Sequence, residues 1–270
     1  MILILFLLGT IGYADAQYYN GPPGPPPPPP PRYRERPQQR DEDLEMTPPS
    51  GYFEISIGLA QPVGSFSGNG GAGYSGYALP GDNISISLGI PINHSNLGIA
   101  LMYSFCSNPF DLNTYVGDVQ YADQSNTYYI PSQAGYGTYD ESFIMGGLFA
   151  TIPIQRLSFD FRLMGGVAIC SLPEITYAAY ATSNTANNDF AWDIASSSTA
   201  GLAFDMGGSI RYKLRRISIM AGIDFTGADP MVSTNKYYID QFGNRSFTHV
   251  GGSLPISITS FSFGLGYEIR

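Results

Sequence analysis

The chain has 270 residues, of which 14% are aromatic and only 13% are charged. A charged fraction so far below the roughly 25% of an average soluble domain argues against an ordinary water-exposed surface. The formal net charge of -9 argues against nucleic acid as a partner, and no apolar run reaches the roughly 18 residues of a membrane-spanning helix.

The first residues have the pattern of a secretory signal peptide. The stretch MILILFLLGTIGYADAQ has an apolar core followed by Ala14-Asp15-Ala16, a small-x-small cleavage site. It departs from the usual pattern because no basic residue precedes the apolar core. We expect a signal peptide over residues 1–16 and an exported mature chain that begins near Gln17, with no cysteine at the cleavage point to carry a lipid anchor.

Residues 17–50 form a proline-rich, low-complexity segment. The run GPPGPPPPPPP at 21–31 has few backbone donors, so it favours extended polyproline and cannot join a sheet. Four arginines and then mainly acidic residues follow it. The segment is predicted to be a disordered periplasmic tether. The alternative is a ligand for a proline-reading or cell-wall partner.

From Gly51 onward, apolar residues alternate with small or polar ones, which is the period of a β-strand with two unlike faces. The stretch LSFDFRLMGGVAIC at 157–170 is typical, since every second residue is apolar or glycine. The same pattern predicts eight strands, which approximate to residues 52–60, 82–92, 97–106, 142–154, 157–170, 200–214, 217–225 and 260–270.

The connections between these strands alternate in length. Short turns are expected at 93–96, 153–156 and 215–216, and long loops at 61–82, 107–141, 171–198 and 227–256. Short turns at one end and long loops at the other are typical of an up-and-down barrel that closes on itself. The two cysteines, Cys106 and Cys170, then fall on strands that are not neighbours, which disfavours a disulfide bridge.

The polar face of these strands decides which side is inside. It carries mainly Gly, Ser and Ala with a few charges of both signs, whereas a water-exposed face would carry many Lys and Glu residues. Small residues and paired charges suit the interior of a narrow barrel, so the apolar face is predicted to contact lipid. The predicted interior charges form a structural network or, alternatively, an ion path; they are Glu54, Asp160, Arg162, Asp205, Arg211, Lys213, Asp224 and Glu268.

Residues 51–270 resemble the outer-membrane β-barrel proteins of Gram-negative envelopes, of the eight-stranded OmpA/OmpX type. The resemblance rests on the signal peptide, on GYFEISIGLAQPVGSFSG at 51–68, and on the closing stretch SFSFGLGYEIR. The closing stretch resembles the C-terminal insertion signal of that family, although the usual pattern ends on an aromatic residue. The resemblance implies an all-β transmembrane barrel domain over 51–270, and we expect no peptidoglycan-binding domain after the barrel.

Function is less clearly encoded than architecture. Tyrosines among Ser, Asn and Gly in the long loops are typical of adaptable binding surfaces, although they also occur in interfacial girdles or as loop packing. The candidate recognition residues are Tyr121, Tyr128, Tyr129, Tyr136, Tyr177, Tyr180, Tyr237 and Tyr238. The loops are also acidic, which allows divalent cations to bridge them to lipopolysaccharide phosphates.

We expect a structural or adhesive role at the cell surface. Outer-membrane lipid and lipopolysaccharide are the expected surroundings, and an extracellular ligand or an envelope protein is the expected partner. The sequence predicts no enzyme, cofactor or metal site. The alternatives are a narrow channel for small or apolar solutes, an accessory subunit of an envelope secretion machine, and a lipid-A-modifying hydrolase that would use His249 beside an acid and a serine.

Overall fold

The structure is a computed structural model that describes residues 51–269, apart from 69–74, 94, 123–127, 130–134, 182–189, 240–241 and 243. The expected signal peptide at 1–16, the expected tether at 17–50 and Arg270 lie outside the described residues. No helix in the described part of the chain is long and apolar enough to cross a membrane.

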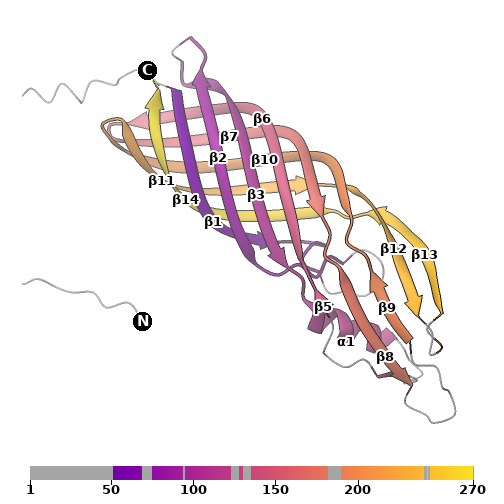
Figure 1. The fold of residues 1–270 in the computed structure, drawn as a ribbon. Coiled ribbons are helices and arrows are strands. Elements are labelled where there is room, and N and C mark those ends of the chain that lie inside the picture. The colour runs from indigo at the N-terminus through magenta and orange to yellow at the C-terminus, as the bar shows by residue number, and fades with distance from the viewer. Residues whose placement is uncertain are drawn as a thin grey trace, which may run out of the picture. The chain divides into compact units, whose positions relative to one another are not determined.

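Eight antiparallel strands close into a barrel in the order β1-β14-β11-β10-β7-β6-β3-β2 (Figure 1). Each barrel strand pairs with the barrel strands that come before and after it along the chain, and β1 pairs with β14 to close the ring. The predicted eight-stranded up-and-down barrel is therefore confirmed. The strands are β1 (Gly51–Pro62), β2 (Gly81–Pro91), β3 (Leu97–Pro109), β6 (Thr138–Ile154), β7 (Leu157–Ser171), β10 (Ser198–Leu214), β11 (Ile217–Ala228) and β14 (Ile256–Ile269).

The three short turns lie at one end of the barrel. Two of them are two-residue turns, between Ile154 and Leu157 and between Leu214 and Ile217. Their first residues, Gln155 and Arg215, have φ values of 57° and 64°. Left-handed backbone at this position turns the chain in the direction of the right-handed strand twist, so strands separated by only two residues can pair fully.

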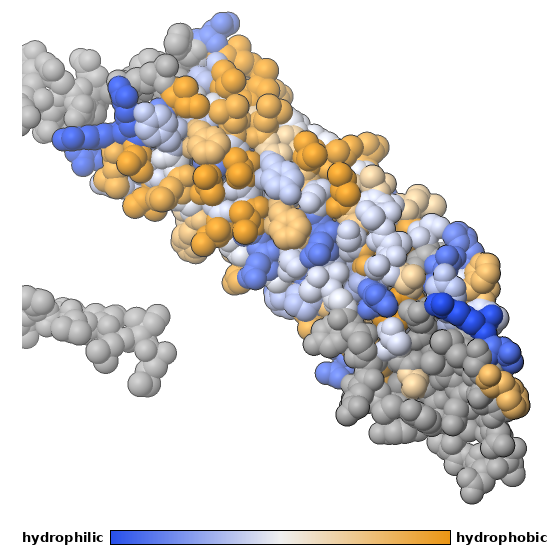
Figure 2. Space-filling view, viewed as in Figure 1, coloured by the Kyte–Doolittle hydropathy of each residue, from blue (hydrophilic) through white to orange (hydrophobic). Residues whose placement is uncertain are grey.

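The outer surface of the barrel is an apolar belt. Outward side chains alternate with inward ones along each strand, and the outward set is aliphatic or aromatic. On β7, for example, Phe161 and Leu163 point outward and are 54% and 63% exposed. Asp160, the residue before Phe161, points inward and is 6% exposed. Apolar residues gather over the barrel strands and become sparse toward β8, β9, β12 and β13 (Figure 2). Such a belt is stable when it faces lipid hydrocarbon.

The long loops contain secondary structure that the sequence analysis did not assign. Strands in these loops form a second antiparallel sheet in the order β13-β12-β9-β8-β4, and β5 also pairs with β8. This external sheet lies at the end of the barrel opposite the short turns (Figure 1). Its strands, and the one helix of the described residues, are α1 (Leu112–Ala122), β4 (Tyr128–Tyr129), β5 (Gly135–Tyr136), β8 (Ile175–Ala181), β9 (Phe190–Ile194), β12 (Met231–Ile239) and β13 (Arg245–Ser253).

Candidate functional site

The centre of the barrel holds two arginines, each shared between acidic side chains. The Arg211 guanidinium on β10 donates to Glu54 of β1 at 3.0 Å and lies 3.2 Å from Asp160 of β7. Its guanidinium carbon also lies 4.1 Å from the ring centre of Tyr52, as in a cation–π contact. Thr151 donates to the other oxygen of Asp160 at 2.5 Å. Three strands are therefore joined through one buried cation, and Asp160 links a fourth, β6, to this group through Thr151.

The second arginine, Arg162 of β7, faces two carboxylates. Its Nε donates to Oδ1 of Asp224 at 2.8 Å, and its terminal nitrogen forms a further bond to Oδ2. The Arg162 Nε lies 3.9 Å from Asp205, which also accepts a bond from Thr226 at 2.9 Å. A two-pronged arginine–carboxylate contact fixes orientation as well as charge, so this group also ties neighbouring strands together.

A third ion pair lies nearer the short turns, where Lys213 and Glu268 are 2.6 Å apart. The Lys213 side chain is 24% exposed, so water screens this pair more than the central ones. All eight interior charges named from the sequence thus point inward, and each of them takes part in an ion pair. Removing either partner of a central pair would leave a charge in a dry interior.

One glycine is required by this packing. A Cβ atom at Gly207 of β10 would overlap the Asp224 carboxylate that holds Arg162. The glycine lets the carboxylate lie directly against the wall of the barrel, and a side chain there would displace it.

The loop end of the interior is filled by aromatic rings. Phe66 packs edge-on against Tyr139 at 5.1 Å between ring centres, and Phe110 lies 5.5 Å from Tyr115 of α1. The Tyr139 hydroxyl donates to the Gly76 carbonyl at 2.8 Å, which holds the first loop over the barrel. Ion pairs thus lie in the middle of the described interior and this aromatic cap lies at its loop end.

Tyr77 is a second anchor of the aromatic cap and lies outside the membrane-spanning strands. Its hydroxyl donates to Asp118 of α1 at 2.9 Å. Burial, together with the bond to the Asp118 carboxylate, raises the pKa of Tyr77 to about 12. The contact therefore depends on a protonated hydroxyl, which joins the first loop to the helix.

Below the cap, Glu141 of β6 lies between Cys106 of β3 and Cys170 of β7. Its side chain is fully buried, and neither carboxyl oxygen has a hydrogen-bond partner among the described residues. Both cysteines are buried and free, because one whole strand separates them. No group of three or more His, Cys, Asp or Glu side chains in the described part of the chain is placed to hold a metal ion.

The tyrosines named as recognition candidates lie mainly in the external sheet and α1. The backbones of Tyr128, Tyr129, Tyr136, Tyr177, Tyr180, Tyr237 and Tyr238 belong to its strands, and that of Tyr121 belongs to α1. Of their side chains the structure describes only that of Tyr237, whose ring lies 6.1 Å from Phe247 on β13 and 3.9 Å from the Arg245 guanidinium. These residues make one face of the β12–β13 hairpin aromatic and cationic.

His249, the histidine of the hydrolase alternative, lies on the same hairpin. Its Nε2 is 2.8 Å from Ser233 Oγ, and its Nδ1 is 3.2 Å from Asn235 Oδ1. Among the described side chains, an amide therefore lies where the hydrolase alternative requires an acid. The group lies on an exposed pair of strands and does not belong to the pocket described below.

A closed antiparallel barrel with an apolar exterior, a charged interior and short turns at one end defines a class. The protein is a small eight-stranded antiparallel barrel of the transmembrane type. No family model and no curated protein matches the sequence.

Several solved structures are similar to this chain at low sequence identity. A major outer membrane protein from Thermus thermophilus is 14% identical over 81% of this chain and 99% of that chain, with a TM-score of 0.43. Neisserial surface protein A is 12% identical over 81% and 97% of the two chains, with a TM-score of 0.42. Ail, the attachment invasion locus protein of Yersinia pestis, is 13% identical over 82% and 100%, with a TM-score of 0.38.

Proposed function

We propose that this protein is a non-conducting outer-membrane barrel that carries an external recognition sheet at the cell surface. The observation that carries the proposal is the sheet β13-β12-β9-β8-β4, which lies at the loop end beyond the apolar belt. A barrel that served only as a membrane plug would need no such sheet, because four tight loops would close it equally well.

The free edge of β13 is the proposed contact surface. Among the described residues, β13 pairs only with β12, so its other edge presents unpaired backbone donors and acceptors. The side chains from Arg245 to His249 are exposed, and Phe247 is 68% exposed. An edge of this kind accepts an extended peptide as an additional strand, while neighbouring side chains select its sequence.

The proposed topology places the short turns and both ends of the barrel domain in the periplasm. An even number of strands returns the chain to its starting side, and in such barrels short turns face the periplasm while long loops face outward. The tether at 17–50 would then extend into the periplasm, and the external sheet, with its tyrosines, would face the extracellular medium.

The filled interior supports this role over a channel. Ions or small solutes would have to displace paired arginines and the aromatic cap, and each displaced charge would remain buried. A hydrolase has less support, because Ser233, His249 and Asn235 lie on an exposed hairpin face. Docking to a secretion machine through the tether concerns residues that the structure does not describe.

A decapeptide phage library, selected against the protein in phospholipid vesicles, tests the proposal. Selected peptides should bind the wild type and lose binding to Gly251→Pro and Phe247→Lys, which block the β13 edge. An exposed first-loop variant, Leu79→Ser, is the matched control and should keep full binding. Bound peptide should also slow hydrogen exchange in β13.

Peptides that bind Gly251→Pro and the wild type equally would contradict recognition at this edge. A planar-bilayer measurement provides an independent test of the barrel itself. Stable conductance steps from the wild-type protein would contradict a filled interior and favour the channel.

A further inference from the structure

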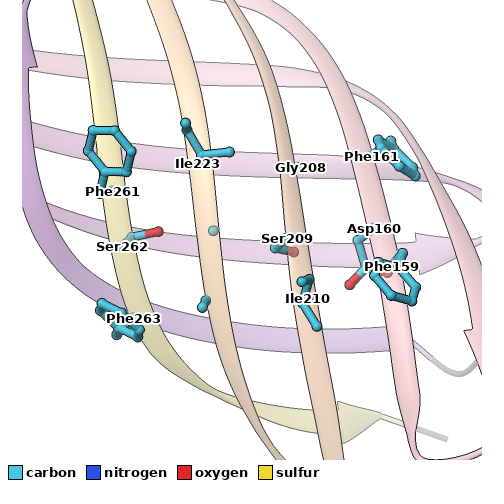
Figure 3. Close-up of a pocket in the computed structure, with 12 residues that line it drawn as sticks. Phe159, Asp160, Phe161, Gly208, Ser209, Ile210, Ile223, Phe261, Ser262 and Phe263 are labelled. Carbon is cyan, nitrogen blue, oxygen red and sulfur yellow. The ribbon is translucent and has the colours of Figure 1, made fainter.

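A groove crosses the lipid-facing wall of the barrel, over four strands from β7 to β14 (Figure 3). One side of it is a row of residues in register: Phe161 of β7, Gly208 of β10, Ile223 of β11 and Phe261 of β14. Both phenylalanines and the isoleucine are about half exposed, whereas Gly208 adds no side chain. The side chains at both ends of the row therefore project from the barrel wall, and the row is interrupted at Gly208.

The other side of the groove is the next outward row, which is also in register. It contains Phe159, Ile210, Ala221 and Phe263 of the same four strands. Here the short member is Ala221, on the strand beside Gly208. Gly208 and Ala221 are diagonal neighbours on adjacent strands, so the two gaps join. Together they form a depression of about 410 Å³ between phenylalanine side chains.

The floor of the groove is backbone, because the row between the two walls points into the barrel. That row contains Asp160, Ser209, Gly222 and Ser262 (Figure 3). The Asp160 carboxylate is directed inward and is bound by Arg211 and Thr151. The groove thus offers a guest almost nothing polar, although a charged network lies immediately behind its floor.

The position of the groove determines the phase from which its occupant comes. Exposed apolar side chains continue beyond it on the same strands, at Leu163, Met206, Ile219 and Leu265. The groove therefore lies within the belt that faces bilayer hydrocarbon, and water is not available to fill it.

The size of the groove separates an acyl chain from a protein partner. Its volume falls within the roughly 300–1,000 Å³ of small-ligand pockets. Twelve residues line it, whereas a stable protein interface uses about 20–30 residues on each side. A flexible chain of methylene groups also fits a furrow bent around two diagonal gaps better than a rigid strand or helix does.

The lining also shows which part of a lipid is bound. No Lys or Arg is among the lining residues, so nothing in the groove could pair with the phosphate of a lipid headgroup. Recognition must come from contact with the chain alone. We infer that the groove between β7 and β14 is a binding site for one acyl chain of a membrane lipid, which takes the place of the side chains missing at Gly208 and Ala221.

Photo-crosslinking tests the inference in the intact protein. The protein is reconstituted in phosphatidylethanolamine–phosphatidylglycerol vesicles that contain a trace of phosphatidylethanolamine with a diazirine in one acyl chain. After illumination, labelled residues are identified by mass spectrometry. Labelling of Phe159, Ile210 and Phe263 should exceed that of lipid-facing residues on the opposite wall, such as Ile84 of β2 and Leu101 of β3, by about threefold, because a seated chain makes more simultaneous contacts.

The variant Gly208→Leu fills the groove and should reduce groove labelling to the level of the opposite wall. Gly165→Leu is the matched control, since Gly165 also faces outward and an added Cβ would have only the Ala203 carbonyl oxygen nearby, at 3.9 Å. It should leave the labelling unchanged. If Gly208→Leu does not fold, Gly208→Ala is the second variant, because its Cβ would make only ordinary contacts of 3.5 Å or more; it should give partial loss.

Three results would overturn the inference. The first is uniform labelling around the barrel, and the second is equal labelling of the Gly208 variants and the Gly165 control. The third is occupation by a second copy of the protein, seen as a protein–protein crosslink between two copies that the Gly208 variants abolish. Protection of the groove by added phospholipid or by added lipopolysaccharide would support the inference and identify which lipid supplies the chain.

Discussion

The substitution Arg211→Met tests whether the interior ion pairs hold the barrel together. Methionine keeps much of the length and volume of arginine while removing its charge and its donors. Glu54 then loses the cation 3.0 Å away, and Asp160 loses the one at 3.2 Å, keeping only its bond from Thr151. Neither side chain can turn to water, because both are buried inside the wall.

The expected loss follows from this burial. Removing one partner of a buried ion pair typically costs about 3–5 kcal/mol, because the remaining charge is uncompensated. Arg211 serves two carboxylates, so the upper part of that range is expected. The matched control is Lys213→Met, which breaks the partly exposed pair with Glu268; its cost should stay within about 1 kcal/mol, as for solvated pairs.

Urea unfolding in phospholipid vesicles, followed by the circular dichroism of the strands, measures both values. The double variant Arg211→Met/Glu54→Gln should recover part of the loss, because it removes one of the two stranded charges. If Arg211→Met costs no more than Lys213→Met, the interior is hydrated and its charges are screened. The proposal of a non-conducting barrel would then lose its main support.

Three further predictions concern the cap, the wall and the topology. The raised pKa of Tyr77, about 12 against about 10 for an unfolded tyrosine, means that its contact with Asp118 stabilises the fold below pH 10 and is lost as the pH rises through 12. Hydrogen exchange in α1 should therefore accelerate over this window in the wild type but not in Tyr77→Phe. Gly207→Ala should destabilise the barrel by about 1–3 kcal/mol in urea unfolding, through overlap with the Asp224 carboxylate, whereas alanine at an outward-facing glycine should be neutral. In intact cells an external protease should cleave the loop between β3 and β6, while an epitope inserted between Pro31 and Thr47 stays protected; cleavage of the epitope would overturn the topology.

The barrel could be predicted from sequence because its two faces meet different solvents. Lipid accepts only apolar side chains, so the outward positions of β7 form an unbroken series from Leu157 to Ile169 that contains one glycine. The interior tolerates charges only in pairs, which restricts Asp160, Arg162 and their partners to the opposite phase. A one-residue shift in register would expose every charge to hydrocarbon, so the pattern is strict.

The external sheet lacks such a constraint, and for that reason the sequence did not reveal it. Both faces of β12 and β13 carry polar or small residues, and pairing depends on backbone bonds between segments far apart in the chain, such as β9 and β12. The groove was also hidden, because Gly208 and Ala221 are ordinary residues until the strand register makes them neighbours. The isolation of Glu141 likewise depends on which strands flank β6.

The arrangement of long strands connects the two halves of the molecule. β6 and β10 each have 17 residues, more than the other barrel strands, and both begin at the loop end of the barrel. The chain passes from β7 into β8, and from β9 into β10, with only three residues between the strands in each case. The ion pairs of Arg162 and Arg211 fix β7 and β10 below the points where these hairpin strands begin. The ion-paired strands thus lead directly into the external sheet. On the proposed function we therefore expect separate effects: interior substitutions should weaken folding and recognition together, whereas substitutions on the β13 edge should weaken recognition alone.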